Sequence, residues 1–144
     1  MTEVQVLLVA QEGFEPIYAN PGDAGCDLRS TEKLTLAPGE RRLIGTGISI
    51  ALPNGFVGLI HPRSGLALKH GITILNSPGT IDAGYRGEIK VTLFNSSSEA
   101  FEIARGDRIA QLVIQRFERA RFIKVESLPD SDRGDGGFGS SGKS

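Results

Sequence analysis

Short stretches in which apolar and polar residues alternate recur along the chain, and this period-two pattern predicts β-strands. In the first stretch Val4, Val6 and Leu8 share one face. Further strands are expected over residues 34–36, 42–52, 56–60, 72–75, 88–94, 101–104, 108–115 and 122–125, and Asp27 lies in another. One short segment, Pro62–His70, holds helix formers, and Gly71 is placed to end that helix.

Glycine and proline separate the expected strands. The chain holds 19 glycines and 7 prolines, and Pro38-Gly39 and Pro53-Asn54-Gly55 mark tight turns. The second turn predicts a hairpin between the strands on either side of it. About ten short strands separated by turns predict an all-β protein, either a sandwich or a barrel such as a jelly roll.

Length and charge narrow the classes of function. A chain of 144 residues fits one domain. With 16 Lys plus Arg and 17 Asp plus Glu, the formal net charge of -1 argues against binding to duplex nucleic acid. No signal peptide is evident, and no apolar run approaches the roughly 20 residues that span a membrane. A single cysteine, Cys26, suits a reducing cytoplasm.

Two other features of composition bear on metals and on mobility. His61 and His70 are isolated, so no zinc spacing is present, and any metal is expected to be a hard ion with an oxygen-rich ligand. Residues 130–144 are rich in glycine and serine and hold one large apolar residue, Phe138. We therefore expect a β-barrel domain over residues 1–129 and a flexible glycine-rich arm over residues 130–144.

Five segments carry side chains that suit chemistry. In Ala24–Leu28, Asp27 is unfavourable in a strand, and is either an edge carboxylate or a carboxylate that faces a hydrated cation. In Pro62–Leu66, the start of the expected helix places backbone N–H groups beside Arg63 and the Ser64 hydroxyl, which is a workable anion cradle. The alternative for this segment is simple N-capping by Ser64.

The third segment, Asn76–Gly87, is a long glycine-rich turn between two apolar strands. Asp82 and Tyr85 lie three residues apart around it, and their side chains are expected to converge. Glycines let the backbone approach a ligand closely. The segment therefore favours a small polar ligand, with a purely structural hairpin as the alternative.

The last two segments are Arg105–Leu112 and Arg133–Gly142. In the fourth, Ile109 and Val113 are expected in the core, and Gln111 is either a buried hydrogen-bonded amide or a ligand donor. The fifth combines a cation, an aromatic ring and hydroxyls among glycines, which suits closure over a base and a phosphate chain; a disordered tail is the alternative. Both contain an Arg-Gly-Asp triplet, but no export signal supports an adhesion role.

Taken in order, the five segments resemble the five motifs of the trimeric deoxyuridine 5′-triphosphate nucleotidohydrolase (dUTPase) family. The resemblance runs from Ala24 to Gly142 and is most specific in the third and fifth segments. Cys26 departs from the family, which often carries an aromatic residue there. The resemblance implies a distorted jelly-roll-like β-barrel that assembles as a homotrimer, with active sites at subunit boundaries that draw on all three chains.

The resemblance also implies an activity, the Mg²⁺-dependent hydrolysis of dUTP to dUMP and pyrophosphate. Asp82 would be the general base that activates the attacking water, and Tyr85 would pack under the deoxyribose and exclude a 2′-hydroxyl. The uracil edge would be read by Asn76 and by the segment Gly79, Thr80 and Ile81.

The phosphate chain and the metal have implied partners as well. Asp27 would hold Mg²⁺ through water, and Phe138 would stack on the uracil. The residues implied to contact the phosphates are Arg63, Ser64, Gly65 and Gln111, with Lys90 as a further candidate, and Arg133, Gly139, Ser140 and Ser141 in the arm.

Two other functions remain alternatives. A dCTP deaminase of the same superfold would need a catalytic acid at the base, whereas this sequence shows the Asp82 and Tyr85 turn and the closing tail. A nucleotide-sensing protein that regulates a partner tends to carry inserts, and this chain is short.

Overall fold

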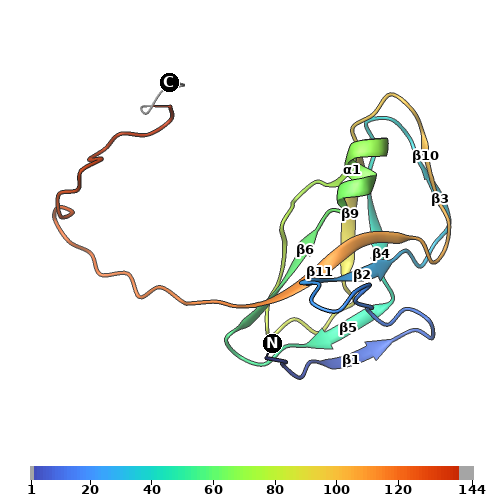
Figure 1. The fold of residues 1–144 in the computed structure, drawn as a ribbon, viewed down its shortest axis with the longest axis horizontal. Helices are drawn as coiled ribbons and strands as arrows, with labels where there is room; N and C mark the ends of the chain where they lie inside the picture. Colours follow the sequence, from blue (N-terminus) through green and yellow to red (C-terminus); the bar gives the residue numbers. More distant parts are fainter. Residues whose placement is uncertain (1, 140–144) are drawn as a thin grey trace.

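Eleven strands and one short helix are present in residues 2–139, the part of the chain that the computed structural model describes (Figure 1). The helix α1 spans Ser64–His70 and ends at Gly71, which is in a left-handed conformation. The strands are β1 (Leu7–Ala10), β2 (Gly25–Arg29), β3 (Leu34–Leu36), β4 (Arg41–Gly45), β5 (Ile48–Ala51), β6 (Phe56–His61), β7 (Ile72–Ile74), β8 (Gly79–Ile81), β9 (Lys90–Asn95), β10 (Phe101–Ile103) and β11 (Arg108–Arg116). The expected all-β fold with one short helix is confirmed.

The strands pair in antiparallel fashion and bring distant parts of the sequence together. Their sheet orders, in the described residues, are β2-β11-β6-β8, β4-β9-β7, β1-β5 and β10-β3. β11 therefore lies between β2 from the beginning of the chain and β6 from its middle, and Figure 1 shows these strands crossing the centre of the body. This arrangement places the second and fourth candidate segments beside the first.

One apolar core fills the space between the sheets. Strand side chains alternate between faces, and the inward set is buried on every sheet, as at Leu28, Ile44, Leu93 and Ile103. Burial of apolar surface is the main favourable term in folding, at roughly 25 cal/mol per Å². The outward set on β2 and β11 is thereby left free to carry polar side chains.

The single strand expected over residues 42–52 is wrong, because it is interrupted. β4 ends at Gly45 and β5 begins at Ile48, and Gly47 between them has a φ of 74°. A residue with a side chain is strained in that left-handed region, whereas glycine adopts it readily. The bend sends β4 to pair with β9 and β5 to pair with β1.

Two further expectations about strands need correction. The turn at Pro53–Gly55 exists, but it does not form a hairpin, because β5 pairs with β1 while β6 pairs with β11 and β8. Residues 122–125 form no strand and are exposed. A strand that was not expected, β8, lies inside the long glycine-rich turn and forms an edge of the largest sheet.

The chain after β11 has a different character from the body. Residues 117–139 contain no helix or strand, and Figure 1 shows them running away from the sheets as an extended segment. Throughout the described part of the chain, no helix has the length and apolar character needed to cross a membrane.

Candidate active site

A row of polar side chains crosses the largest sheet. Asp27 on β2 lies opposite Gln111 on β11, and Gln111 lies opposite His61 on β6. Directly opposed residues of antiparallel strands point to the same face, so these three side chains share a face. Their neighbours Cys26 and Leu112 point the other way and are buried. The row therefore lies on the outer face of the sheet.

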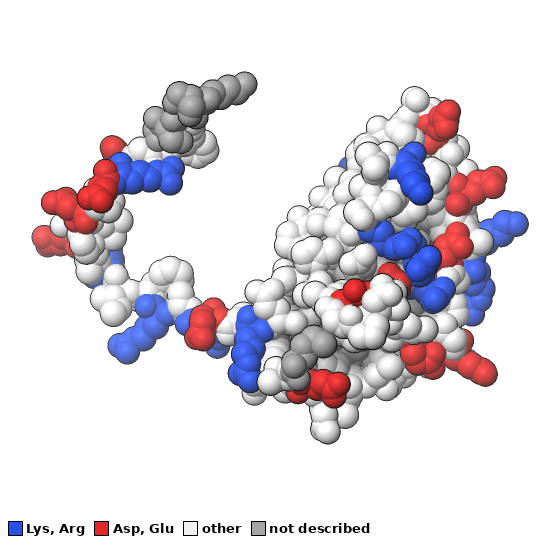
Figure 2. Space-filling model, viewed as in Figure 1, with Lys and Arg blue, Asp and Glu red and all other residues white. Residues whose placement is uncertain are grey.

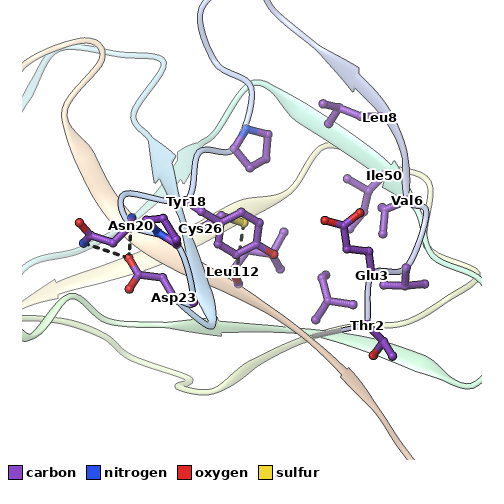
Figure 3. Close-up of a pocket in the computed structure, with 15 residues that line it drawn as sticks. Thr2, Glu3, Val6, Leu8, Tyr18, Asn20, Asp23, Cys26, Ile50 and Leu112 are labelled. Carbon is purple, nitrogen blue, oxygen red and sulfur yellow. Dashed lines mark hydrogen bonds between the residues drawn. The ribbon is translucent and has the colours of Figure 1, made fainter.

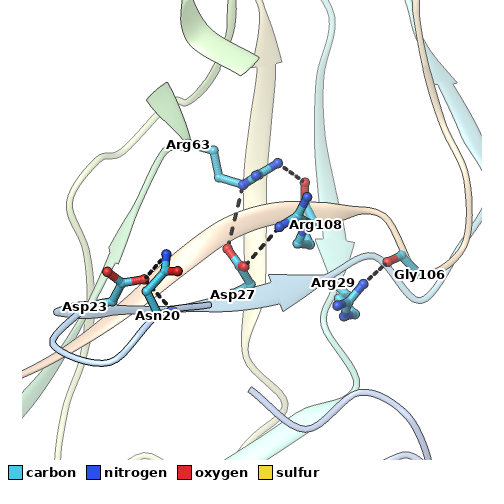
Figure 4. Close-up of polar contacts among 7 residues, drawn as sticks. All are labelled: Asn20, Asp23, Asp27, Arg29, Arg63, Gly106 and Arg108. Carbon is cyan, nitrogen blue, oxygen red and sulfur yellow. Dashed lines mark hydrogen bonds and ion pairs between the residues drawn. The ribbon is translucent and has the colours of Figure 1, made fainter. Parts of the chain in front are cut away.

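Two arginines converge on the carboxylate of Asp27 (Figure 4). Arg63 Nε lies 3.7 Å from Oδ1, and Arg108 Nη1 lies 3.6 Å from Oδ2. Arg63 Nη1 also donates a hydrogen bond of 3.3 Å to the carbonyl of Arg108. Two guanidinium groups against one carboxylate leave a local positive charge, and Figure 2 shows Lys and Arg side chains gathered with acidic ones over β2 and β11. A site with this balance favours an anion.

The start of α1 adds polar groups next to Arg63. Arg63 is the N-cap residue, with an extended backbone at φ −89° and ψ 128°, and no side chain caps the helix. The interpretation of Ser64 as an N-cap is therefore wrong, since Ser64 is the first helical residue. The first N–H groups of a helix have no partner within it, and Ser64 and Gly65 are exposed. An anion bound near Arg63 would meet these groups.

A second cluster of polar side chains lies in the segment between β7 and β9. The N–H of Tyr85 donates a hydrogen bond of 3.1 Å to the carbonyl of Asp82, which closes a tight turn directly after β8. The side chains of Asp82 and Tyr85 do not bond to each other. Within residues 2–139 the exposed Asp82 carboxylate forms no hydrogen bond or ion pair.

The ring of Tyr85 is held by its own turn. Its hydroxyl donates to the carbonyl of Glu88 at 2.9 Å, and a Cβ added at Gly87 would lie only 2.6 Å from that hydroxyl. The Glu88 carboxylate accepts a hydrogen bond of 3.2 Å from the N–H of Gly47. Arg86 donates to two carbonyl groups of the turn, at 2.6 and 3.1 Å. The turn is therefore braced both internally and against the body.

The remaining residues expected to read a base lie beside this turn. β8 pairs with β6 on one side only, so the other backbone edge of Gly79–Ile81 is unpaired in the sheet. The amide nitrogen of Asn76 would lie 3.7 Å from a Cβ placed on Gly79, which puts the Asn76 side chain next to this strand. Asn76 and Thr80 are exposed and Ile81 is half-buried.

The polar cluster at Asp82 and the polar cluster at Asp27 make no direct polar contact with each other among the described residues of one chain. No hydrogen bond or ion pair between described residues joins Asp82 or Tyr85 to Asp27, Arg63 or Gln111. Lys90 is exposed at the start of β9 and makes no such contact with either group.

The arm carries three of its expected site residues within the described part. Arg133 turns back and donates to the carbonyl of Gly136, and Phe138 is fully exposed, with a φ of 49°. Gly139 is also exposed. Ser140 and Ser141 lie outside the described residues. In this conformation neither Arg133 nor Phe138 contacts the body.

A cavity of about 580 Å³ lies on the face of β2 and β11 that is opposite to the face of Asp27 (Figure 3). Val6, Ile50 and Leu112 line it, and Tyr18 and Cys26 border it. Burial raises the pKa of the Cys26 thiol, which donates a hydrogen bond of 3.3 Å to the carbonyl of Leu112. The lining is mainly apolar, so this cavity does not offer the groups that a triphosphate needs.

No cluster of three or more metal-ligating side chains is found within residues 2–139. Arg63 and Arg108, with the Asp27 carboxylate between them, form the arginine group. The charge of that carboxylate is already shared by the two guanidinium ions. Mg²⁺ keeps several waters and is usually bound by one or two carboxylates together with substrate phosphates. The donor set therefore fits a Mg²⁺ ion that is carried by a phosphate ligand and held through water.

Sequence reasoning did not single out Arg108, Arg86 or Glu88. The side chain of Arg108 completes the arginine group, and the other two brace the turn that carries Tyr85. The one available signal for Arg108 was the pair of adjacent apolar residues Ile109 and Ala110, which breaks the alternation of a strand.

Comparisons with known proteins show the family of the chain. A family model described as dUTPase matches residues 12–142. Deoxyuridine 5′-triphosphate nucleotidohydrolases from Thermobifida fusca and Rhodococcus erythropolis are 62% and 64% identical over 128 residues, which is 88% of this chain and 72% and 78% of theirs. The match thus spans nearly the whole barrel and the arm.

Solved structures show the same fold. A Staphylococcus bacteriophage 80alpha dUTPase with dUPNHPP superposes with a TM-score of 0.88 at 30% identity, over 96% of this chain and 99% of that one. A mutant dUTPase from phage phi11 of S. aureus, described with a structural Mg(II) ion, gives a TM-score of 0.80 at 26% identity, over 88% and 100% of the two chains. The fold is that of an all-β protein of the dUTPase type. The chain belongs to the dUTPase family.

Proposed function

We propose that this protein hydrolyses dUTP to dUMP and pyrophosphate. The observation that carries the proposal is the Asp82 carboxylate, which lies beside Tyr85 in a braced turn and is engaged by no other described residue. A carboxylate in that state is free to accept a proton from a water molecule. The water oxygen bonds to the α-phosphorus, the bond to the bridging oxygen breaks, and pyrophosphate leaves. The reaction would supply dUMP for thymidylate synthesis and keep uracil out of DNA.

The nucleoside is assigned to the turn and to β8. The open backbone edge of Gly79–Ile81 offers N–H and C=O groups in a fixed order, with the Asn76 amide beside it. Cytosine presents the opposite pattern, and such mismatches can give discrimination of about 10⁴. The ring of Tyr85, held against Gly87, would lie under the deoxyribose and leave no space for a 2′-hydroxyl.

The phosphate chain is assigned to the arginine group. Arg63, Ser64 and Gly65 would bind it at the start of α1, and Gln111 lies on the same face of the sheet. Lys90 is kept as a further candidate contact. Because these groups are positioned before the substrate arrives, catalysis would rest mainly on orientation and charge stabilisation.

Mg²⁺ is the proposed cofactor. Asp27 would hold it through water while the triphosphate oxygens bind it directly, as suits an ion that dehydrates reluctantly. When bound, the metal would offset negative charge on the phosphates. Asp27 would keep the metal and the two arginines on one side of the phosphate chain.

The arm over residues 130–144 would close the site over the barrel domain of residues 1–129. Phe138 is exposed and available to stack on the uracil. Arg133, Gly139, Ser140 and Ser141 would then bind the γ-phosphate. Closure of this kind excludes water and completes a site only when substrate is present.

A homotrimer is the proposed assembly, with each site shared among subunits. Among the described residues of one chain, no hydrogen bond or ion pair joins the Asp82 turn to the arginine group, so a second chain would bring them together. Large apolar side chains are exposed at Leu7 and Val9 on β1, and at Phe122 and Leu128 in the segment that follows β11. Exposed apolar surface of this kind marks interaction sites. The cytoplasm is the proposed location, supported by the single buried cysteine.

The activity is tested by pyrophosphate release from dUTP, dTTP, dCTP and UTP, each with and without Mg²⁺. Of the four nucleotides, we expect only dUTP to release pyrophosphate rapidly. The rate of that release should fall strongly when the metal is chelated. Equal rates with dTTP or UTP would contradict the assignment of the pocket. Ammonia release from dCTP would instead identify a deaminase.

A further inference from the structure

The strand β11 contains an irregularity beside the site. Its pairing with β2 runs Gln111 to Asp27 and Ala110 to Leu28, and then shifts so that Arg108, not Ile109, lies opposite Arg29. One extra residue is therefore inserted at Ile109, which is a β-bulge. Bulges of this kind re-aim side chains and are common next to active sites.

The bulge decides where Arg108 points. Gln111 faces outward, and strict alternation would turn Ala110 inward, Ile109 outward and Arg108 inward. Instead Ile109 and Ala110 are both buried, and the side chain of Arg108 is 46% exposed and reaches Asp27. The expectation that Ile109 and Val113 share the core is thus half right, since Val113 is only half-buried. The inserted residue brings Arg108 to the same face as Asp27 and Gln111.

Three contacts connect Arg108, Asp27 and Arg63 in a closed ring. The Arg108 guanidinium pairs with one carboxylate oxygen of Asp27, and the other oxygen faces Arg63 Nε. Arg63 Nη1 then returns to the carbonyl of Arg108. The ring joins β2, the start of α1 and β11, so it fixes the relative position of three separate segments (Figure 4).

The ring leaves Arg63 with free donors. A guanidinium has five N–H groups in a rigid plane. In the ring, one N–H at Nη1 donates a hydrogen bond, and the single Nε–H faces Asp27 as an ion pair only. The Nε atom is buried and forms no hydrogen bond within residues 2–139, because Asp27 Oδ1 is 3.7 Å away. Arg63 is therefore held in orientation by Asp27 and by Arg108, while its remaining N–H groups are available to an anion.

We infer that Arg108 is a positioning residue of the triphosphate site, which acts through Asp27 and through its own carbonyl to orient Arg63. This inference rests on the proposed function, since it takes the phosphate chain of dUTP as the anion that Arg63 binds. Asp27 has a corresponding role: its carboxylate holds the two guanidinium groups apart at a fixed spacing, in addition to any contact with hydrated metal.

The first experiment separates the phosphate chain from the nucleoside. For Arg108→Gln, calorimetry with Mg²⁺ and the α,β-imido analogue of dUTP should show about a tenfold weaker affinity, because a charged contact that orients Arg63 is lost. Affinity for dUMP should change less than twofold, since the turn at Asp82 is untouched. Arg108→Lys should recover part of the loss. A matching loss for dUMP would show a general structural role and overturn the inference.

The second experiment tests whether Arg108 acts through Arg63. In an Arg63→Gln background, adding Arg108→Gln should weaken binding of the imido analogue by less than twofold, because the group that it orients is already gone. A full tenfold further loss would show that Arg108 contacts phosphate independently, and would overturn the positioning role.

A matched control is available on another sheet. Arg42 is 42% exposed and pairs with Glu40 at 3.4 Å, which resembles the exposure and pairing of Arg108. Arg42→Gln should bind the imido analogue as the wild type does. The wild-type protein is assayed for dUTP hydrolysis in the same preparation. If it does not hydrolyse dUTP, the proposed function fails. If it does, and Arg108→Gln binds the imido analogue as tightly as the wild type, only the inference fails.

Discussion

Asp27 and Asp82 are the two carboxylates of the proposed site, and they lie in different environments. Asp27 is 12% exposed and is paired with Arg63 and Arg108 on β2, one edge strand of the largest sheet. Asp82 lies on an exposed turn at the edge of that sheet and has no partner within the described chain. The Asp27 carboxylate thus has two cationic partners, whereas the Asp82 carboxylate is open to solvent and to a ligand. These environments support the proposal that Asp82 transfers the proton and that Asp27 organises the charge of the site.

The largest effect is expected for Asp82→Asn. A well-placed general base contributes about 10²–10⁴-fold to the rate, so single-turnover hydrolysis of dUTP should slow by that factor. Affinity for the α,β-imido analogue should remain within a few-fold of wild type, because the amide keeps the shape of the side chain. Hydrolysis at the wild-type single-turnover rate would remove Asp82 from the role of base.

Removal of residues 130–144 should have the next largest effect. The buried core lies entirely in the body, so the truncated protein should melt at the wild-type temperature and keep its oligomeric state by sedimentation. Turnover should fall about 100-fold, since positioning effects of that size follow from small losses of geometry. Full activity of the truncated protein would show that both carboxylates work without the arm.

Asp27→Asn should have a smaller effect on the rate than Asp82→Asn. Loss of the charge that orients two arginines should lower kcat/KM for Mg²⁺-dUTP by about tenfold, and should raise the Mg²⁺ concentration needed for half-maximal rate. Affinity for dUMP should not change. If Asp27→Asn instead blocked the chemical step with normal binding, the division of roles between the two carboxylates would be wrong.

The smallest effect is expected for Gly87→Ala, which alters the Asp82 turn without touching either carboxylate. The added methyl group would lie 2.6 Å from the Tyr85 hydroxyl and displace the ring. Overpacking of this kind costs about 1–3 kcal/mol, and the ratio of kcat/KM for dUTP over UTP should fall several-fold. Gly84→Ala is the control, because a Cβ there meets no atom within 4 Å. An unchanged ratio in Gly87→Ala would separate Tyr85 from sugar selection.

Local patterns were sufficient for much of the fold. Apolar alternation predicted the positions of β3, β6, β7, β9 and β10 within a residue or two, since a buried face requires period two wherever the strands pair. The pattern failed over residues 42–52, because the bend at Gly47 separates two strands that are each apolar. It also failed over residues 122–125, where apolar residues are exposed on the described chain and form no strand.

The order of the five segments determined the family, and that conclusion is confirmed by the match over residues 12–142. Side-chain type and spacing along the chain are sufficient for such recognition, because a turn with Asp82 and Tyr85 among glycines is visible without knowing its neighbours. The roles of the individual site residues stay predictions until the experiments above are done.

Tertiary structure alone decided which side chains meet. Asp27 and Arg108 are 81 positions apart by their numbers, and only the pairing of β2 with β11, together with one inserted residue, brings them to the same face. Alternation within a strand is a local property, whereas register and bulges are set by the partner strand. The sequence by itself therefore determined the fold class and the family and predicted the residues of the site. The three-dimensional pairing decided that one carboxylate is held by arginines while the other has no partner in the described chain.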